Sequence, residues 1–157
     1  MPSKPGFKKS SCSAKAHFAV VVAQFNASIA ESLLKACLDE FSRLGVCECD
    51  IHVVHVPGAF EIPLTALKLS QKKNIQAVIG LGAVIRGQTL HYELVAGQAA
   101  RAMMDISLQS GKPVVFEILA ADTVKLCEAR AKPGDRDNKG ASAARVAFEM
   151  AGILRDL

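Results

Sequence analysis

The feature that most limits the fold is a regular alternation of short apolar segments with longer segments of helical periodicity. The apolar segments are rich in valine and isoleucine and occupy residues 17–23, 50–56, 75–85 and 113–121. Such runs are typical of strands buried on both faces, and we expect Gly80 and Gly82 to break the third one. Helical patterns follow at residues 28–44, 63–73, 90–110 and 123–131, with a last helix at 140–155. Alternating strands and helices predict one parallel sheet with helices on both of its faces.

This order of elements predicts an α/β fold, a three-layer α/β/α sandwich around a four-stranded parallel sheet of the flavodoxin-like type. We expect residues 16–157 to form a single domain, because 157 residues is the length of one ordinary domain. Residues 1–15 are predicted to be a flexible basic arm, since their four lysines have no acidic residue among them. The net charge of +4 therefore belongs to the arm, and the rest of the chain is neutral overall.

Local signals describe the start and the outer face of the first helix. Ser28 and Glu31 have the spacing of a capping box. Two i,i+4 ion pairs are expected on the outer face, Glu31 with Lys35 and Asp39 with Arg43.

The composition argues against several classes of protein. Aromatic residues make up 5% of the chain and tryptophan is absent, which disfavours a nucleic-acid surface. No uncharged apolar run reaches the roughly 18 residues of a membrane span, and no apolar segment follows the basic start as in a secretory signal. Cys47 and Cys49 are too close in sequence for a structural zinc site and are expected to be ordinary thiols. A cytoplasmic, reduced chain with no metal and no cofactor is the simplest interpretation.

In open parallel sheets the ligand binds outside the carboxyl ends of the strands. This rule selects four loops, at residues 24–28, 57–62, 83–91 and 121–124. In the first loop, Phe25 either closes the core or offers a flat face to a ligand. In the second, Gly58 permits close approach to the backbone, Phe60 supplies an apolar face and Glu61 an acceptor for hydroxyl groups. A simple helix-initiating turn explains the second loop equally well.

The third loop has the chemistry of an anion site. It joins a buried strand to a helix N-terminus, where free amide groups favour an anion, and Gly87 lets a phosphate come close. It is not a Walker loop, because no G-K-[ST] follows, and Gly80-x-Gly82 lacks the rest of a dinucleotide fingerprint. His91 lies in the first helical turn, where the dipole favours the neutral imidazole that suits proton transfer. Taken alone, His91 is better explained as a hydrogen-bonded surface residue.

A basic cluster lies between the last two helices. It contains Arg130, Lys132, Arg136 and Lys139, interleaved with two aspartates. The cluster is either a solvated, salt-bridged loop or a site where one arginine turns inward to hold a phosphate.

Four segments, in chain order, together resemble the lumazine synthase family, which carries out the penultimate step of riboflavin synthesis. They are Phe25-Asn26, the V-P-G-A-F-E-I-P run at 56–63, the G-A-V-I-R-G-Q-T-L-H-Y-E run at 82–93, and Asn138-Lys139-Gly140. The second and third runs are highly specific in combination, and the resemblance extends over roughly residues 17–155.

The resemblance implies a condensation that uses no metal or organic cofactor. The amine of 5-amino-6-(D-ribitylamino)uracil attacks the ketone of 3,4-dihydroxy-2-butanone 4-phosphate, an imine forms, phosphate leaves, and the ring closes with loss of water. Holding the two substrates in register would supply much of the catalysis. Two alternatives are an archaeal-type riboflavin synthase, which dismutates two lumazine molecules, and a non-catalytic flavin- or lumazine-binding carrier or shell protein. A phosphate-binding stretch with Arg130 argues against the first, and His91 together with Arg130 argues against the second.

The resemblance also implies the roles of individual residues. Phe25 would stack on the pyrimidine, Glu61 would bind the ribityl hydroxyls, and His91 would move protons. The pyrimidine edge would bind to main-chain groups, and the phosphate would lie in the third loop. The remaining substrate-binding residues of the same subunit would be Asn26, Ala59, Phe60, Ala83, Val84, Ile85, Gly87, Gln88 and Thr89.

The same resemblance implies that the pocket is shared between subunits. Phe116, Arg130 and Lys139 would complete it from a neighbouring subunit, with Arg130 on the phosphate. A homopentamer with active sites at its interfaces is therefore expected, with riboflavin synthase as a further partner. Ser142 stands where the family often has an acidic residue, which puts in question what orients Arg130. The loop at 132–138 is slightly longer than the family's short form and favours a free pentamer over a shell of sixty chains.

Overall fold

The computed structural model describes residues 17–157 and shows four strands and five α-helices in alternating order. The predicted basic arm at residues 1–15 lies outside the described residues. The strands are β1 (His17–Ala23), β2 (Ile51–Val56), β3 (Ile75–Ile85) and β4 (Val114–Ala121). The helices are α1 (Ala27–Arg43), α2 (Ile62–Ser70), α3 (His91–Ser110), α4 (Val124–Arg130) and α5 (Lys139–Asp156), with short 3-10 turns at Glu48–Asp50 and Ala59–Glu61.

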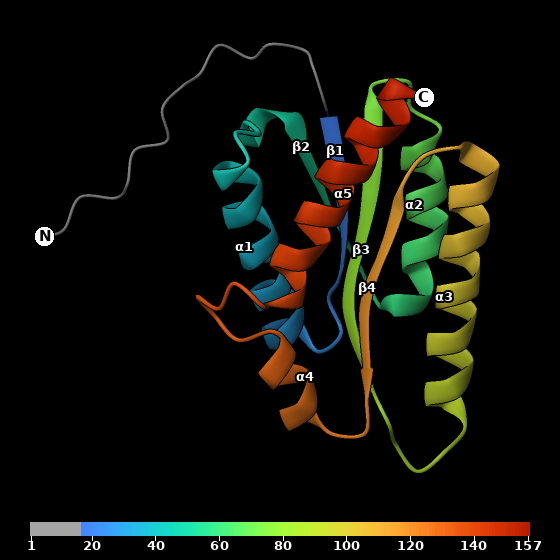
Figure 1. Cartoon of the computed structure of the whole chain (residues 1–157). Coiled ribbons are helices and arrows are strands. Elements are labelled where there is room, and N and C mark those ends of the chain that lie inside the picture. The colour runs from blue at the N-terminus through green and yellow to red at the C-terminus, as the bar shows by residue number, and fades with distance from the viewer. Residues whose placement is uncertain (1–16) are drawn as a thin grey trace, which may run out of the picture.

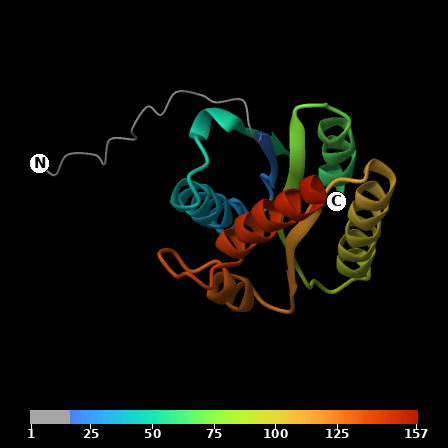
Figure 2. The ribbon, with the colours of Figure 1, turned by 45° about the horizontal axis from the view of Figure 1, so that its top comes forward.

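The four strands form one parallel sheet in the order β2-β1-β3-β4, which confirms the predicted three-layer α/β fold. Helices α1 and α5 cover one face of the sheet, and α2 and α3 cover the other (Figures 1 and 2). The central strands β1 and β3 are buried on both faces, whereas the edge strands β2 and β4 are only partly buried, contrary to the expectation from their apolar runs. In β1, burial on both faces gives six consecutive buried residues after His17, as its unbroken apolar run predicts.

The prediction that two glycines break the third strand is wrong. β3 runs without interruption over eleven residues. A Cβ at Gly80 would lie 2.7 Å from the Met103 side chain of α3 and 2.8 Å from the Ile62 side chain of α2. The missing side chain therefore lets both helices pack closely on the sheet, a tertiary role that the local sequence does not reveal.

The predicted capping box at Ser28 is also wrong, because α1 begins one residue earlier, at Ala27. The two expected i,i+4 pairs do not form either. Glu31 instead contacts Nε2 of His55 on β2 at 2.8 Å, and Lys35 contacts Asp39 at 2.8 Å. Long-range partners and the true start of the helix have redirected these side chains.

Helices α1 and α5 approach each other closely at the start of α5. The buried Asn138 caps this helix: its side-chain oxygen accepts from the N–H of Gly140 at 2.8 Å. A Cβ at Gly140 would fall 1.9 Å from the carbonyl oxygen of Leu33 on α1, so only glycine fits there. Glu40 on α1 is buried and ion-paired with Arg145 of α5 and with Arg43, each at 3.1 Å.

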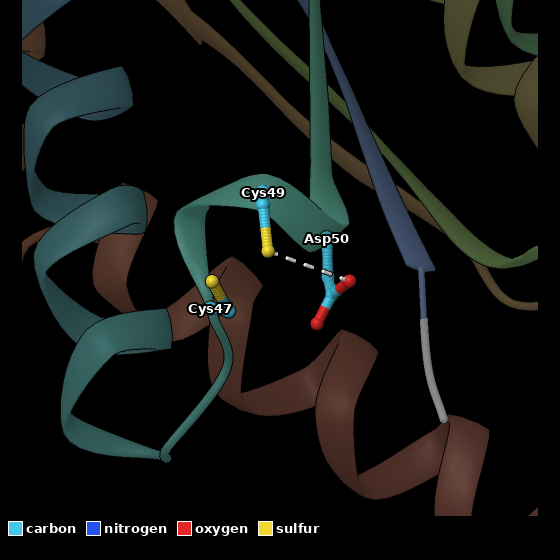
Figure 3. Close-up of side chains that lie close together, drawn as sticks. All are labelled: Cys47, Cys49 and Asp50. Carbon is cyan, nitrogen blue, oxygen red and sulfur yellow. Dashed lines mark hydrogen bonds between the residues drawn. The ribbon is translucent and has the colours of Figure 1, made fainter. Parts of the chain in front are cut away.

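Cysteine side chains gather at the amino edge of the sheet, just before β2 begins. Figure 3 shows Cys47, Cys49 and Asp50 close together, and one donor atom from each lies within 4.8 Å of the others. Cys49 is disulfide-bonded, which corrects the expectation that both cysteines are ordinary thiols, whereas Cys47 is free. A disulfide sulfur is not a thiolate ligand, so we assign no metal to this group. Within residues 17–157, no helix combines the length and the apolar character that a membrane crossing requires.

Candidate active site

The first three candidate loops meet at the carboxyl edge of the sheet, the lower end in Figure 1. In the strand order β2-β1-β3-β4, the chain passes from β1 outward to β2 and then returns to the other side of β1 to form β3. The loops therefore lie at the topological switch point between β1 and β3. The main-chain N–H of Phe25 donates to the carbonyl of Pro57 at 3.0 Å, which joins the loop after β1 to the loop after β2. The amide Nδ2 of Asn26 donates to the carbonyl of Ala83 at 2.8 Å and joins the same loop to β3. Backbone and side-chain hydrogen bonds thus fix three loops relative to one another.

Asn26 performs this function in a left-handed conformation, with φ of 56°. It is the only non-glycine residue with positive φ in the described part of the chain. Asparagine adopts this region more readily than most residues, and here the resulting turn aims its amide at Ala83. Asn26 was expected to bind substrate, but its amide nitrogen is already engaged in supporting the loop.

Two phenylalanine side chains project from these loops into solvent. Phe25 is 72% exposed and Phe60 is 59% exposed, although neighbouring Ala59 is buried. Exposed phenylalanine rings cost free energy unless something covers them, so both rings provide flat apolar faces for a planar ligand or a second chain. Glu61 is also exposed and is free to accept hydrogen bonds from hydroxyl groups.

The last residues of β3 offer main-chain groups. Pairing of β3 with β1 ends at Leu81, whereas its pairing with β4 continues to Ile85. On the β1 side, Val84 and Ile85 therefore extend beyond the last paired residue of the described sheet. A planar heterocycle with donors and acceptors along one edge fits this position, because it can pair with the strand as another strand would.

The third loop leads directly into α3, a helix of 20 residues whose first residue is His91. Gly87, Gln88 and Thr89 are all exposed, and a Cβ at Gly87 would meet nothing within 4 Å. Oγ1 of Thr89 accepts from the N–H of His91 at 3.3 Å. The open loop leads to a helix N-terminus, an arrangement that can accept an anion, although the N–H groups of His91 and Glu93 already bond to Thr89 and Leu90.

Arg86, which sequence reasoning did not single out, organises the start of this loop. Its Nε donates to Oδ1 of Asp122 at 2.6 Å, and its Nη1 donates to Oε1 of Glu93 at 3.2 Å. The guanidinium also lies 4.8 Å from the centroid of the Tyr92 ring. These contacts, above all that with Asp122, raise the pKa of Arg86. The adjacent sequence Tyr92-Glu93 is part of the family motif, but nothing local points to Asp122.

Phe116, Arg130 and Lys139 lie on β4, α4 and α5, and none of them belongs to the loops that carry Phe25 and Phe60. Phe116 is 37% exposed on the edge strand. Arg130 donates from Nη1 to the carbonyl of Leu126 within its own helix, at 2.9 Å, so a backbone carbonyl holds it in this structure.

Lys139 lies near an acidic residue that the sequence analysis also missed. Burial raises the pKa of the Glu117 carboxyl on β4, and the positive charge of Lys139 partly offsets that rise. A single glutamate inside an apolar strand was the available signal. The candidate residues Phe116, Arg130 and Lys139 are therefore accompanied by a charge pair between Lys139 and Glu117.

Together these features define a class of protein: an open α/β sheet with exposed aromatic rings and an open loop before a helix N-terminus at its carboxyl edge. The family model for 6,7-dimethyl-8-ribityllumazine synthase matches residues 15–155, and the chain belongs to that family. It is also 44% identical over 136 residues to the 6,7-dimethyl-8-ribityllumazine synthase of Thermus thermophilus, which covers 87% of this chain and 86% of the relative. These matches support the synthase over the two alternative functions.

Among solved structures, the chain is similar to the lactose-specific IIB component domain of the phosphoenolpyruvate:carbohydrate phosphotransferase system from Streptococcus pneumoniae. The TM-score is 0.40 and the identity 12%, over 87% of this chain and 98% of that chain. A score this low does not establish a shared fold.

Proposed function

We propose that the loops at the carboxyl edge of β1, β2 and β3 form one half of the active site of a 6,7-dimethyl-8-ribityllumazine synthase. As a member of this family, the chain catalyses the condensation of 5-amino-6-(D-ribitylamino)uracil with 3,4-dihydroxy-2-butanone 4-phosphate. The reaction releases phosphate and water and belongs to riboflavin biosynthesis. The family match over residues 15–155 is the observation that carries this conclusion.

The geometry supports a specific placement of the pyrimidine. Phe25 is exposed and stacks on the ring, and the main chain of Val84 and Ile85 pairs with its polar edge. Ala59 and Phe60 line the pocket, and Glu61 accepts hydrogen bonds from the ribityl hydroxyls. Because Asn26 holds the carbonyl of Ala83, these two residues set the distance between the stacking ring and the strand.

The phosphate of the second substrate lies at the start of α3. Gly87, Gln88 and Thr89 present main-chain N–H groups to it, and the partial positive charge of the helix N-terminus favours the anion. The His91 imidazole is next to this position and moves protons as the imine forms and the ring closes. The chain's own contribution is to hold two reactants in contact and to relay protons between them.

Mixing the purified protein with both substrates tests this proposal. Formation of the lumazine is followed by its absorbance and fluorescence, and phosphate release is measured in the same reaction. One phosphate for each lumazine is expected. A protein that converts added lumazine to riboflavin, or that binds lumazine without making it, would instead match one of the two alternatives.

We further propose that the second half of the site comes from another copy of the chain. Phe116 lies on the edge strand β4, Arg130 on the helix that follows β4, and Lys139 near Glu117 of β4, whereas the loops with Phe25 and Phe60 follow β1 and β2. A head-to-tail contact brings these two unlike surfaces together, and such contacts close into rings. The neighbour's Arg130 then pairs with the phosphate, released from its present contact with Leu126.

Exposed apolar side chains on α3 support self-association. Leu94 is 60% exposed, Met104 60% and Leu108 75%, on an outer face that also carries the ion pair of Arg101 with Asp105. We propose a homopentamer, with the loop at 132–138 favouring a free pentamer. Sedimentation velocity at several concentrations tests this: a species near five chains is expected. A fully active species near 17 kDa would contradict the shared site, and a particle near sixty chains would contradict only the free pentamer.

Two further proposals concern the setting of the enzyme. A riboflavin synthase is the expected partner, because it consumes the lumazine product. We place the protein in the cytoplasm, since a phosphorylated substrate does not cross membranes freely and three of the described cysteines are free. Thiol labelling in freshly broken cells tests this placement: we expect Cys49 to be labelled as a thiol, and a Cys49 that remains in its disulfide would contradict the cytoplasm.

A further inference from the structure

The loop that is proposed to hold the phosphate has little to fix it except Arg86. Within residues 87–91, the Thr89 hydroxyl accepts one hydrogen bond from the loop's own backbone. All five residues are exposed, and the space around Gly87 is open. A loop with so few packed contacts takes its shape from what holds its two ends.

Arg86 holds both of those ends. Its main-chain N–H donates to the carbonyl of Ala121 at 2.9 Å, which keeps the start of the loop against the end of β4. Its guanidinium reaches across the loop to Tyr92 and Glu93 in the first turn of α3. One side chain thus bridges the residue before the loop and the residues after it.

A third point anchors the same guanidinium. Asp122 follows β4 and contacts Nε of Arg86 at 2.6 Å, the shortest ion pair in the described part of the chain. The planar guanidinium, with donors on several sides, reaches two carboxylates and a ring at once, which an ammonium group cannot do. The two carboxylates outnumber its single positive charge, so this arginine has no excess charge to offer a phosphate.

We infer that Arg86 is a positioning residue for the phosphate loop: anchored by Asp122, it sets the direction of the loop's N–H groups instead of binding the phosphate itself. The inference rests on the proposed function, since it assigns the loop to the phosphate of the butanone substrate. It predicts an unusual pattern, in which removing a carboxylate weakens the binding of an anion. A direct arginine–phosphate contact predicts the opposite, because Asp122 would then compete for the guanidinium and repel the phosphate.

The test uses the full chain with four variants: Arg86→Gln, Arg86→Lys, Asp122→Ala and the double variant Arg86→Gln/Asp122→Ala. Arg155→Gln is the matched control, because Arg155 also pairs with an exposed aspartate but lies at the far end of α5. Titration with inorganic phosphate measures the anion site without turnover. Steady-state kinetics then give KM for each substrate separately, and thermal unfolding reports on stability.

We expect each single variant, including Arg86→Lys, to weaken phosphate binding roughly ten-fold, because displaced donors lose much of their effect. KM for the butanone phosphate rises by a similar factor, and KM for the pyrimidine stays within about two-fold. The double variant is no weaker than Arg86→Gln alone, since Asp122 acts only through Arg86. The melting temperature changes little, because exposed ion pairs contribute little to stability.

Any of four results would overturn the inference. Tighter phosphate binding in Asp122→Ala, or unchanged binding in Arg86→Lys, would make Arg86 a direct ligand. Equal rises in both KM values with a large fall in melting temperature would make its role merely structural. A wild-type chain that binds no phosphate would remove the site itself. If phosphate binds as expected but no lumazine forms, the proposed function fails and the inference about Arg86 stands.

Discussion

Substituting Gly140 by alanine should destabilise the protein far more than one added methyl group would suggest. The new Cβ would lie 1.9 Å from the carbonyl oxygen of Leu33, 2.6 Å from its carbonyl carbon and 2.8 Å from its Cα. Ordinary contacts of a Cβ begin near 3.4 Å, so α5 must move away from α1 by about 1.5 Å. All three neighbouring atoms belong to the backbone, and no side-chain rotation can relieve the clash.

The size of the destabilisation follows from the packing around this contact. Overpacking a core typically costs about 1–3 kcal/mol, and a backbone clash between two helices belongs at or above the upper end. Separation of the helices also disturbs Ala143, Ala144 and Ala147, which are fully buried on α5. A loss of about 3 kcal/mol lowers the melting temperature by roughly 6–12 °C in a domain of this size.

Gly152→Ala is the matched control, because it lies on the same helix and its Cβ would meet only an Arg155 side-chain atom at 4.0 Å. Alanine is favoured over glycine inside a helix, so this variant should gain about 0.5–1 kcal/mol. Urea unfolding at a fixed chain concentration, followed by circular dichroism, measures both variants. If the two substitutions shifted the midpoint alike, the close contact between α1 and α5 would be refuted.

Three further predictions follow from the ion pairs and the site. Burial alone would raise the pKa of Glu40, but Arg145 and Arg43 outweigh burial and lower that pKa below 4.5. The stabilising effect of the ionised Glu40 side chain is therefore lost as the pH falls through this lowered pKa. Acid titration should therefore show wild type losing its advantage over Glu40→Gln below about pH 4.5; an advantage that is independent of pH would contradict the ion pairs. His91→Ala should slow turnover by up to ~10²–10⁴-fold without abolishing it, because positioning survives, and a wild-type kcat would exclude His91 from the chemistry. Arg130→Ala should raise KM for the butanone phosphate far more than KM for the pyrimidine, whereas equal rises would assign Arg130 to the fold or the subunit contact.

The strands and most of the element boundaries could be predicted because their signals are local. A short apolar run rich in β-branched residues gave β1 as His17–Ala23. The helix expected at 90–110 ends at Ser110, where Gly111 follows with a φ of 67°. Patterns of this kind depend on neighbouring residues alone, so one sequence contains the whole signal.

The errors occurred where a distant residue determines the structure. Gly80 looks like a strand breaker until Ile62 and Met103 fill the space that its side chain would occupy. Glu31 has a suitable lysine four residues away, but its partner is His55 on another strand. Neither contact could be deduced from spacing, because both require the assembled sheet.

The candidate site likewise has features that the sequence predicts and contacts that only the structure reveals. The general rule for parallel sheets selected the carboxyl edge of the fold, where the first three loops meet, and the family resemblance supplied the proposed residue roles. The contact of Asn26 with Ala83 and that of Arg86 with Asp122 became visible only with the structure. Both link segments that are more than thirty residues apart in sequence.

The central claim is that one active site takes its two halves from two copies of the chain, and subunit mixing tests it most directly. Gly87→Asp places a carboxylate in the open phosphate loop, and Arg130→Ala removes the cation of the other half. Assayed at a butanone phosphate concentration well below the raised KM of Arg130→Ala, each homo-oligomer should be nearly inactive. Co-assembled at equal amounts, the two variants should regain activity in about a quarter of the sites, where both halves are native. Mixed oligomers that form but remain inactive would show that the whole site lies within one chain.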